Sequence, residues 1–123
     1  MKPPKDDSRY TWTSHVFGKM LHYGIGEGRI RRIIRTPTRI EEGIAENTIA
    51  AMCPYGTSPE GRQLYGKPND NKKRWFPRGG EMWVMYKLDG GKIKVITAWR
   101  YPGKSSARNP IPKDIIDEVR QLV

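Results

Sequence analysis

The sequence predicts a single α+β domain, with two N-terminal helices packed on an antiparallel sheet of about four strands, followed by a C-terminal helix. Two short segments near the N-terminus have apolar residues at helical spacing, and two alternating strands flank a Gly-Gly turn late in the chain. The last residues again show a helical period. A chain of 123 residues is long enough for one such core but not for two.

The two N-terminal helices follow residues 1 to 10, which we expect to form a flexible arm. The first helix should begin near Ser14 as its N-cap and end at the glycines of residues 24 to 28. Its inward-facing residues are predicted to be Val16, Phe17, Met20 and Leu21. The second helix should span residues 27 to 35, with isoleucines inward and arginines outward, and end at Thr36-Pro37.

The strands are predicted in two hairpins. Residues 38 to 52 indicate two short strands around a turn near residues 43 to 47. Residues 81 to 101 give a second hairpin with Gly90 and Gly91 as its loop. The register this loop predicts pairs Leu88 with Ile93, Tyr86 with Val95, Val84 with Thr97, Met82 with Trp99, and Glu81 with Arg100. We expect one face of this hairpin to pack on the core and the other to be open to a partner.

A long loop and a final helix complete the chain. Residues 54 to 80 are rich in proline and glycine and have no sustained period, so they are either a disordered excursion or a functional loop. Residues 112 to 123 carry an apolar stripe behind Pro112, which is typical of a helix.

Charge is the most informative bulk property. The chain has 23 Lys and Arg against 13 Asp and Glu, a net charge of +10, which favours a polyanionic partner. A basic surface that merely keeps the protein solvated is the alternative. We expect a cytoplasmic protein, because no apolar run is long enough to cross a bilayer and no secretory signal is evident. The single cysteine, Cys53, is a poor metal ligand without neighbours.

Two basic clusters point toward nucleic acid. Five arginines fall within residues 29 to 39, a stretch without an acid, and a second cluster in residues 67 to 78 mixes cations with aromatic rings. Cations suit phosphates and flat rings suit unstacked bases, so single-stranded RNA or DNA is the expected ligand. The predicted nucleic-acid-binding residues are Arg32, Arg35, Arg39, Lys72, Lys73, Arg74, Trp75 and Lys94.

The only histidines, His15 and His22, lie seven residues apart with Lys19 between them. On a helix they would be about 10 Å apart along the axis, which is too far to share a metal ion. Their position alone leaves two interpretations of His15 open, a structural residue hydrogen-bonded to a neighbour or an acid/base group.

The segments "SHVFGKM", "YGI", "IRRIIRTPTRIEEG" and "KIKVITAW" resemble a widespread bacterial family known as a domain of unknown function. Members open with a His-Ala-x-x-Arg-Met helix and end with a strand containing Val-Ile-Thr. That family is similar to the BrnT and RelE-like ribonuclease toxins, which are compact α+β proteins. The match covers about residues 12 to 43 and 81 to 101. Here Val16 replaces the usual Ala, and Lys19 replaces the usual Arg, keeping the charge but losing the planar fork.

Residues and resemblance together predict a small RNA-binding protein of RelE-like fold, with metal-independent endoribonuclease activity of the toxin type as the leading hypothesis. Such cleavage requires a base, an acid and cations that stabilise the charge on phosphorus. His15 is the acid/base candidate, Lys19 and Arg100 are the charge stabilisers, and Glu81 or Tyr101 could orient Arg100 or move a proton.

No cofactor and no metal are expected for this reaction. The expected partner is RNA, single-stranded or ribosome-associated, with an antitoxin protein as a candidate second partner and no membrane. The competing hypothesis is a non-catalytic nucleic-acid-binding or protein-interaction module with the same fold.

Overall fold

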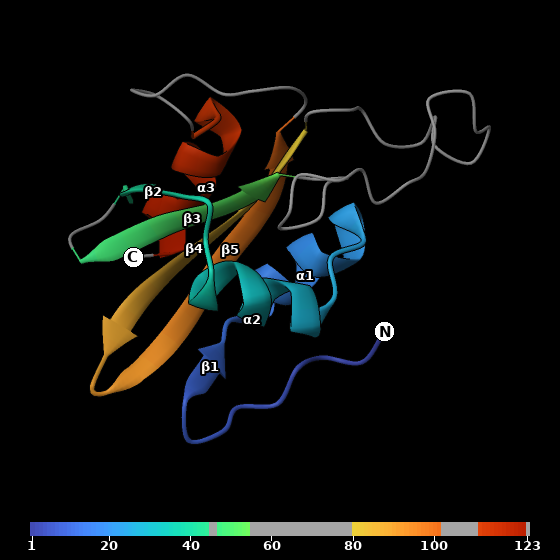
Figure 1. Cartoon of the computed structure of the whole chain (residues 1–123), viewed down its shortest axis with the longest axis vertical. Helices are drawn as coiled ribbons and strands as arrows, with labels where there is room; N and C mark the ends of the chain where they lie inside the picture. Colours follow the sequence, from blue (N-terminus) through green and yellow to red (C-terminus); the bar gives the residue numbers. More distant parts are fainter. Residues whose placement is uncertain (45–46, 55–79, 102–110, 123) are drawn as a thin grey trace.

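A mixed five-stranded sheet with the order β1-β5-β4-β3-β2 organises the chain (Figure 1). The computed structural model describes residues 1–44, 47–54, 80–101 and 111–122. The strands are β1 (Tyr10–Trp12), β2 (Arg39–Glu42), β3 (Thr48–Pro54), β4 (Glu81–Asp89) and β5 (Lys92–Tyr101). The helices are α1 (Ser14–Tyr23), α2 (Glu27–Arg35) and α3 (Lys113–Leu122). The α+β class is therefore confirmed.

The sheet differs from the predicted antiparallel sheet of about four strands. The additional strand, β1, pairs in parallel with β5, and the other pairings are antiparallel. β1 was not predicted, because three residues are too few to show an alternating pattern. Part of the segment expected to be a free arm is attached to the sheet, because Asp6 accepts a hydrogen bond from the Trp12 N–H at 2.9 Å.

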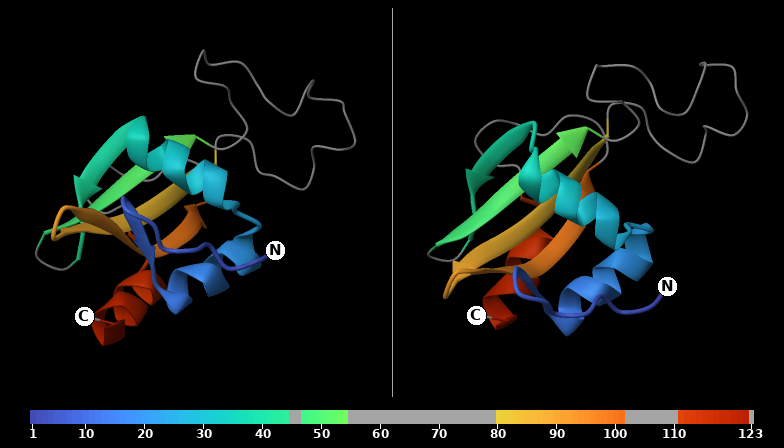
Figure 2. Two further views of the ribbon diagram at one scale, coloured as in Figure 1. Left: turned by 90° about the horizontal axis from the view of Figure 1, so that it is seen from below. Right: turned by 60° about the horizontal axis from the view of Figure 1, so that its bottom comes forward.

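Helices cover both faces of the sheet, whereas the prediction left one face open (Figure 2). α1 and α2 pack with Val84 and Val95 in one core, and α3 packs with Trp83 and Trp99 in the other. The six residues Glu81–Tyr86 are buried, because the alternating side chains of β4 meet a core on either side. Such a continuous apolar run is typical of a strand with both faces covered.

The β4–β5 hairpin has the predicted loop but only half of the predicted register. Tyr86 pairs with Val95 as expected, whereas Val84 pairs with Ala98 instead of Thr97. A β-bulge between these pairs adds one residue to β5, so every later pair is shifted by one. The shifted pairs are Trp83 with Trp99, Met82 with Arg100, and Glu81 with Tyr101. Beyond the bulge the predicted register is wrong.

α1 begins one residue earlier than predicted. The N-cap is Thr13 rather than Ser14, and its Oγ1 accepts a hydrogen bond from the Val16 N–H at 3.0 Å. The helix ends at Gly24, whose φ of 69° is in the left-handed region that glycine tolerates best. Of the apolar residues expected inside, Val16 and Met20 are buried, but Leu21 is 52% exposed.

α2 agrees with its prediction in both bounds and orientation. Ile30, Ile33 and Ile34 are buried against the sheet, and Arg32 and Arg35 are exposed on the outer surface. The hairpin between β2 and β3 was also predicted correctly, with Glu42 paired to Ile49 across the turn. Residues 55 to 79, which include most of the predicted long loop, lie outside the described residues.

Candidate functional site

A group of polar side chains that contact one another lies between α1, β5 and α3. We call it the His15 cluster, and it consists of His15, Lys19, Thr97 and Glu118. Two features of the backbone bring these residues together: the way α1 starts beside β5, and the bulge in β5.

The start of α1 is fastened to β5 by one threonine. The Thr13 N–H donates to the Val95 carbonyl at 3.2 Å, and Thr13 Oγ1 donates to the Ile96 carbonyl at 2.8 Å. These bonds fix the first turn of α1 against the edge of β5 that continues beyond β1. His15, in that first turn, therefore lies beside the strand residues that follow Ile96.

The bulge determines which of those residues faces α3. Thr97 pairs with Met85, and Met85 packs in the α3 core, so Thr97 projects on the α3 face of the sheet. In the predicted register Thr97 would have paired with Val84, on the face that α1 and α2 cover. The bulge thus places the buried Thr97 hydroxyl where His15 of α1 can form a hydrogen bond with it.

Within the cluster, Glu118 is the shared partner. Lys19 Nζ donates a hydrogen bond to Glu118 Oε1 at 3.0 Å and lies 2.8 Å from Oε2. His15 Nε2 is 3.3 Å from Glu118 Oε2 and 3.1 Å from Thr97 Oγ1. Oε2 is itself buried without a well-aligned hydrogen bond. The side chains are partly accessible, at 22% for His15, 16% for Lys19 and 36% for Glu118.

This arrangement resembles acid/base machinery in its chemistry. If the neutral His15 ring carries its proton on Nε2, the Nε2–H group donates a hydrogen bond to Glu118 or Thr97. The other ring nitrogen, Nδ1, is then unprotonated and can accept a proton from a substrate. The Lys19 ammonium supplies a positive charge near the ring, and Glu118 holds both side chains in place. The same contacts also join α1 to α3, so a structural role for His15 has equal geometric support.

The other predicted catalytic residues lie elsewhere. Arg100 pairs with Met82 and projects on the α1–α2 face, whereas Glu81 and Tyr101 project on the α3 face. Tyr101 is four residues beyond Thr97, about 13 Å along an extended strand. The structure therefore brings His15 and Lys19 together but separates Arg100 from Glu81 and Tyr101.

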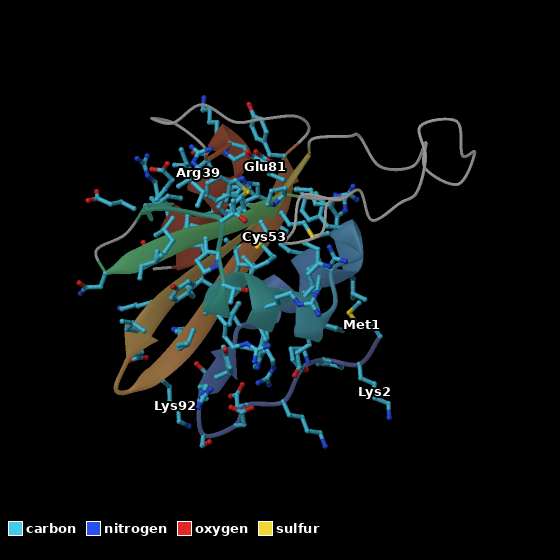
Figure 3. The ribbon with its side chains drawn as sticks, in the orientation of Figure 1. Met1, Lys2, Arg39, Cys53, Glu81 and Lys92 are labelled. Carbon is cyan, nitrogen blue, oxygen red and sulfur yellow. The ribbon has the colours of Figure 1, made fainter. Side chains whose placement is uncertain are left out.

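Glu81 belongs to a second cluster with Arg39. Glu81 is 4% exposed and accepts a hydrogen bond from Trp83 Nε1 at 3.0 Å. Arg39 lies near Glu81 (Figure 3), with its Nη1 3.9 Å from the carboxylate. The guanidinium carbon of Arg39 lies 5.2 Å from the centre of the Trp83 ring. Arg39 also donates to Glu41 at 2.9 Å. Arg39, which was predicted to bind nucleic acid, is thus engaged in packing β2 onto the α3 core.

Arg32, Arg35 and Lys94, the described residues among the remaining predicted nucleic-acid-binding residues, do not share one surface. Arg32 and Arg35 are exposed on the outer surface of α2. Lys94 is exposed and pairs with Thr11 and Lys87, so it projects on the α3 face. The predicted loop residues Lys72, Lys73, Arg74 and Trp75 lie outside the described residues.

A third ionic group holds the N-terminal turn to α2. Asp7 Oδ1 accepts hydrogen bonds from the backbone N–H groups of Arg9 and Tyr10, both at 2.8 Å. Asp7 Oδ2 lies 3.0 Å from Arg31 Nη2, and Arg31 also contacts Glu27 at 2.8 Å. The bonds from Tyr10, Arg9 and Arg31 lower the pKa of Asp7 to about 2. Asp7 in turn raises the pKa of the Arg31 guanidinium.

In the described part of the chain, no group of three or more histidine, cysteine, aspartate or glutamate side chains could hold a metal ion. Each helix of that part is too short or too polar to cross a bilayer.

Comparisons with known protein families, with curated proteins and with solved structures gave no match. The assignment of a function therefore rests on the residues and their geometry.

Sequence reasoning missed Glu118. It is 99 residues from Lys19 in the chain, and its position on α3 gave no sign of which face of the sheet α3 would cover. The one available signal in the sequence was that Glu118 lies directly beside Val119, which belongs to the apolar stripe of the last helix.

The Lys19–Glu118 pair should stabilise the attachment of α3. In a double-mutant cycle with Lys19→Met and Glu118→Gln, we expect a coupling energy of about 0.5 to 1 kcal/mol, because both groups are partly screened by water. Urea unfolding of the four proteins measures it. Asp117→Asn, an exposed neighbour on the same helix, is the control and should show no coupling with Lys19. A Lys19–Glu118 coupling below about 0.2 kcal/mol would contradict a stabilising role.

The Asp7 network should make stability depend on pH in the acid range. The pKa of Asp7 falls from 3.8 to about 2 on folding, so its contribution is present above pH 4 and is lost as the pH falls toward 2. Asp7→Asn should therefore be less stable than the parent at pH 6, with the difference vanishing near pH 2. Urea unfolding at both pH values measures this, with Asp89→Asn in the exposed hairpin turn as control. An Asp7 carboxyl that titrates near pH 4 by NMR would contradict the network.

Proposed function

We propose that this chain binds RNA through its basic surface. The observation that carries the proposal is the outer surface of α2, where Arg32 and Arg35 project to solvent and, among the described residues, have no acidic partner. In the described part of the chain, the acidic side chains that form ion pairs contact other basic residues, such as Lys19, Arg31 and Arg39. The positive charges of Arg32 and Arg35 are therefore directed outward, where phosphates can reach them.

The RelE-like fold is part of this proposal. Support comes from the order of elements, in which two helices precede the main strands and pack on one face of the sheet. The parallel strand β1 and the placement of α3 on the other face depart from the simple two-helix arrangement. Family resemblance in the first helix and the last strand favours the same class.

A second candidate function, metal-independent RNA cleavage, is favoured by the His15 cluster. In the proposed step, His15 takes the proton of a ribose 2′-hydroxyl, the 2′-oxygen bonds to phosphorus, and the bond from phosphorus to the 5′-oxygen breaks. The leaving 5′-oxygen takes a proton from water, and Lys19 stabilises the negative charge that develops on the phosphoryl oxygens. The step gives Arg100, Glu81 and Tyr101 no role, because they lie on another face or about 13 Å away along β5.

RNA binding is tested by fluorescence anisotropy with a labelled single-stranded RNA over a series of KCl concentrations. We expect binding that weakens steeply with salt, because neutralised phosphates release counterions. Replacing Lys72, Lys73 and Arg74 with Ala should reduce the salt slope by about 2, at about 0.7 for each lost phosphate contact.

The matched control removes the same charge at Lys2, Lys113 and Arg120, which are exposed. It should leave the slope nearly unchanged. Equal losses in the two triple variants would show that only net charge matters, and no binding by the parent protein would refute the proposal.

Cleavage is tested with clean protein and single-stranded RNA in the presence of EDTA. We expect products ending in 2′,3′-cyclic phosphate, no activity in His15→Ala, and a rate about a hundredfold lower in Lys19→Met. His22→Ala is the matched control, because His22 is exposed and its ring contacts the neighbouring Tyr23 ring at 4.6 Å rather than the His15 cluster. Intact RNA at pH 6 to 8, or full activity in His15→Ala, would leave His15 with its structural role.

A further inference from the structure

A hollow of about 340 Å³ opens between the N-terminal turn and α2. Its lining residues are Asp7, Ser8, Arg9, Tyr10, Arg31 and Arg35. Three of the six are arginines, brought together from two segments that are 22 residues or more apart in the sequence.

The one acid in this hollow is already committed. Asp7 Oδ1 accepts two backbone hydrogen bonds, and Oδ2 is paired with Arg31. Its negative charge therefore offsets Arg31 and leaves little attraction for the other two arginines. Arg31 is further held by Glu27 and by the Tyr10 ring, which lies 4.5 Å from the guanidinium carbon.

Arg9 and Arg35 differ from Arg31, which is paired with acids. Both side chains are exposed, and in the described part of the chain neither forms an ion pair with an acid. Two guanidinium groups that line the same hollow repel one another unless an anion lies between them. The Ser8 hydroxyl, also at the rim, can donate a hydrogen bond to the same anion.

The floor of the hollow determines what part of a nucleic acid fits. Tyr10 is 2% exposed and its ring is covered by Arg31 and packed near Trp12 at 5.9 Å. Because no bare aromatic face is available here, an unstacked base has nothing to stack on. A phosphate, by contrast, matches the planar forks of Arg9 and Arg35 and can be bound by both at once.

We propose that the hollow between the N-terminal turn and α2 binds a backbone phosphate of RNA through Arg9 and Arg35, with no preference for the base. This rests on the proposed RNA binding and adds to it a defined contact. It also assigns the N-terminal segment a function in positioning the ligand, because the Asp7 turn sets the place of Arg9 beside α2.

The test compares the parent with Arg9→Gln/Arg35→Gln, using labelled ten-nucleotide oligouridylate and oligoadenylate in the salt series. We expect the slope to fall by about 0.7, the value for one phosphate that is no longer neutralised, equally for the two RNAs. The double variant Lys113→Gln/Arg120→Gln on α3 is the charge-matched control and should keep the parental slope. Thermal melting should be unchanged, because both arginines are exposed.

A second variant, Arg9→Lys/Arg35→Lys, separates charge from geometry. It should keep the slope but bind several-fold more weakly, because lysine retains the charge and loses the planar fork. Parental slopes in the glutamine variant, or an equal loss in the α3 control, would overturn the phosphate site while RNA binding itself stood. A preference of the site for one of the two RNAs would overturn its indifference to the base, and a parent protein that binds neither RNA would overturn both proposals.

Discussion

The extra residue in β5 is the constraint on which the arrangement of this molecule depends. Before the bulge, β4 and β5 pair as the Gly90-Gly91 loop dictates, and after it each β5 side chain has changed face. Trp99 thereby joins Trp83 on the α3 face, where the two rings stack at 5.7 Å. Those rings give α3 an apolar surface to cover, and the same shift places the Thr97 hydroxyl within 3.1 Å of His15 Nε2. A hairpin without the bulge would keep its turn but would place Trp99 opposite Met82, on the α1–α2 face and away from Trp83.

How far the fold could be predicted depends on how local its determinants are. α2 was predictable because Ile30, Ile33 and Ile34 mark one helical face without ambiguity, and the loop of the last hairpin because Gly90 and Gly91 both have positive φ. The bulge at Ile96 was not predictable, because both registers pair apolar residues of β4 with apolar residues of β5. The α3 face could in principle have been inferred from the unbroken apolar run of β4.

The candidate site was predictable only in part, for the same reason. His15 and Lys19 are four residues apart on one helix, so their proximity follows from helical spacing alone. Their common partner, Glu118, depends on the bulge and on the face that α3 selects, and these are tertiary choices. Arg31 and Arg39 look like Arg32 and Arg35 in the sequence, yet each is held by two acids in the structure. Composition reveals the charge of a segment but not which charges are already paired.

The pairing of charges also limits how a chain with a net charge of +10 can stay folded. Repulsion between its positive side chains destabilises a compact basic protein. This repulsion is reduced where a partly buried cation is paired with an acid. Lys19, Arg31 and Arg39 follow this rule at three separate junctions between elements. Arg9 and Arg35 line one hollow and, among the described residues, form no ion pair with an acid. Because a ligand that binds only the folded state stabilises that state, an anion bound between them would link the binding of a polyanion to the holding of the N-terminal turn on α2.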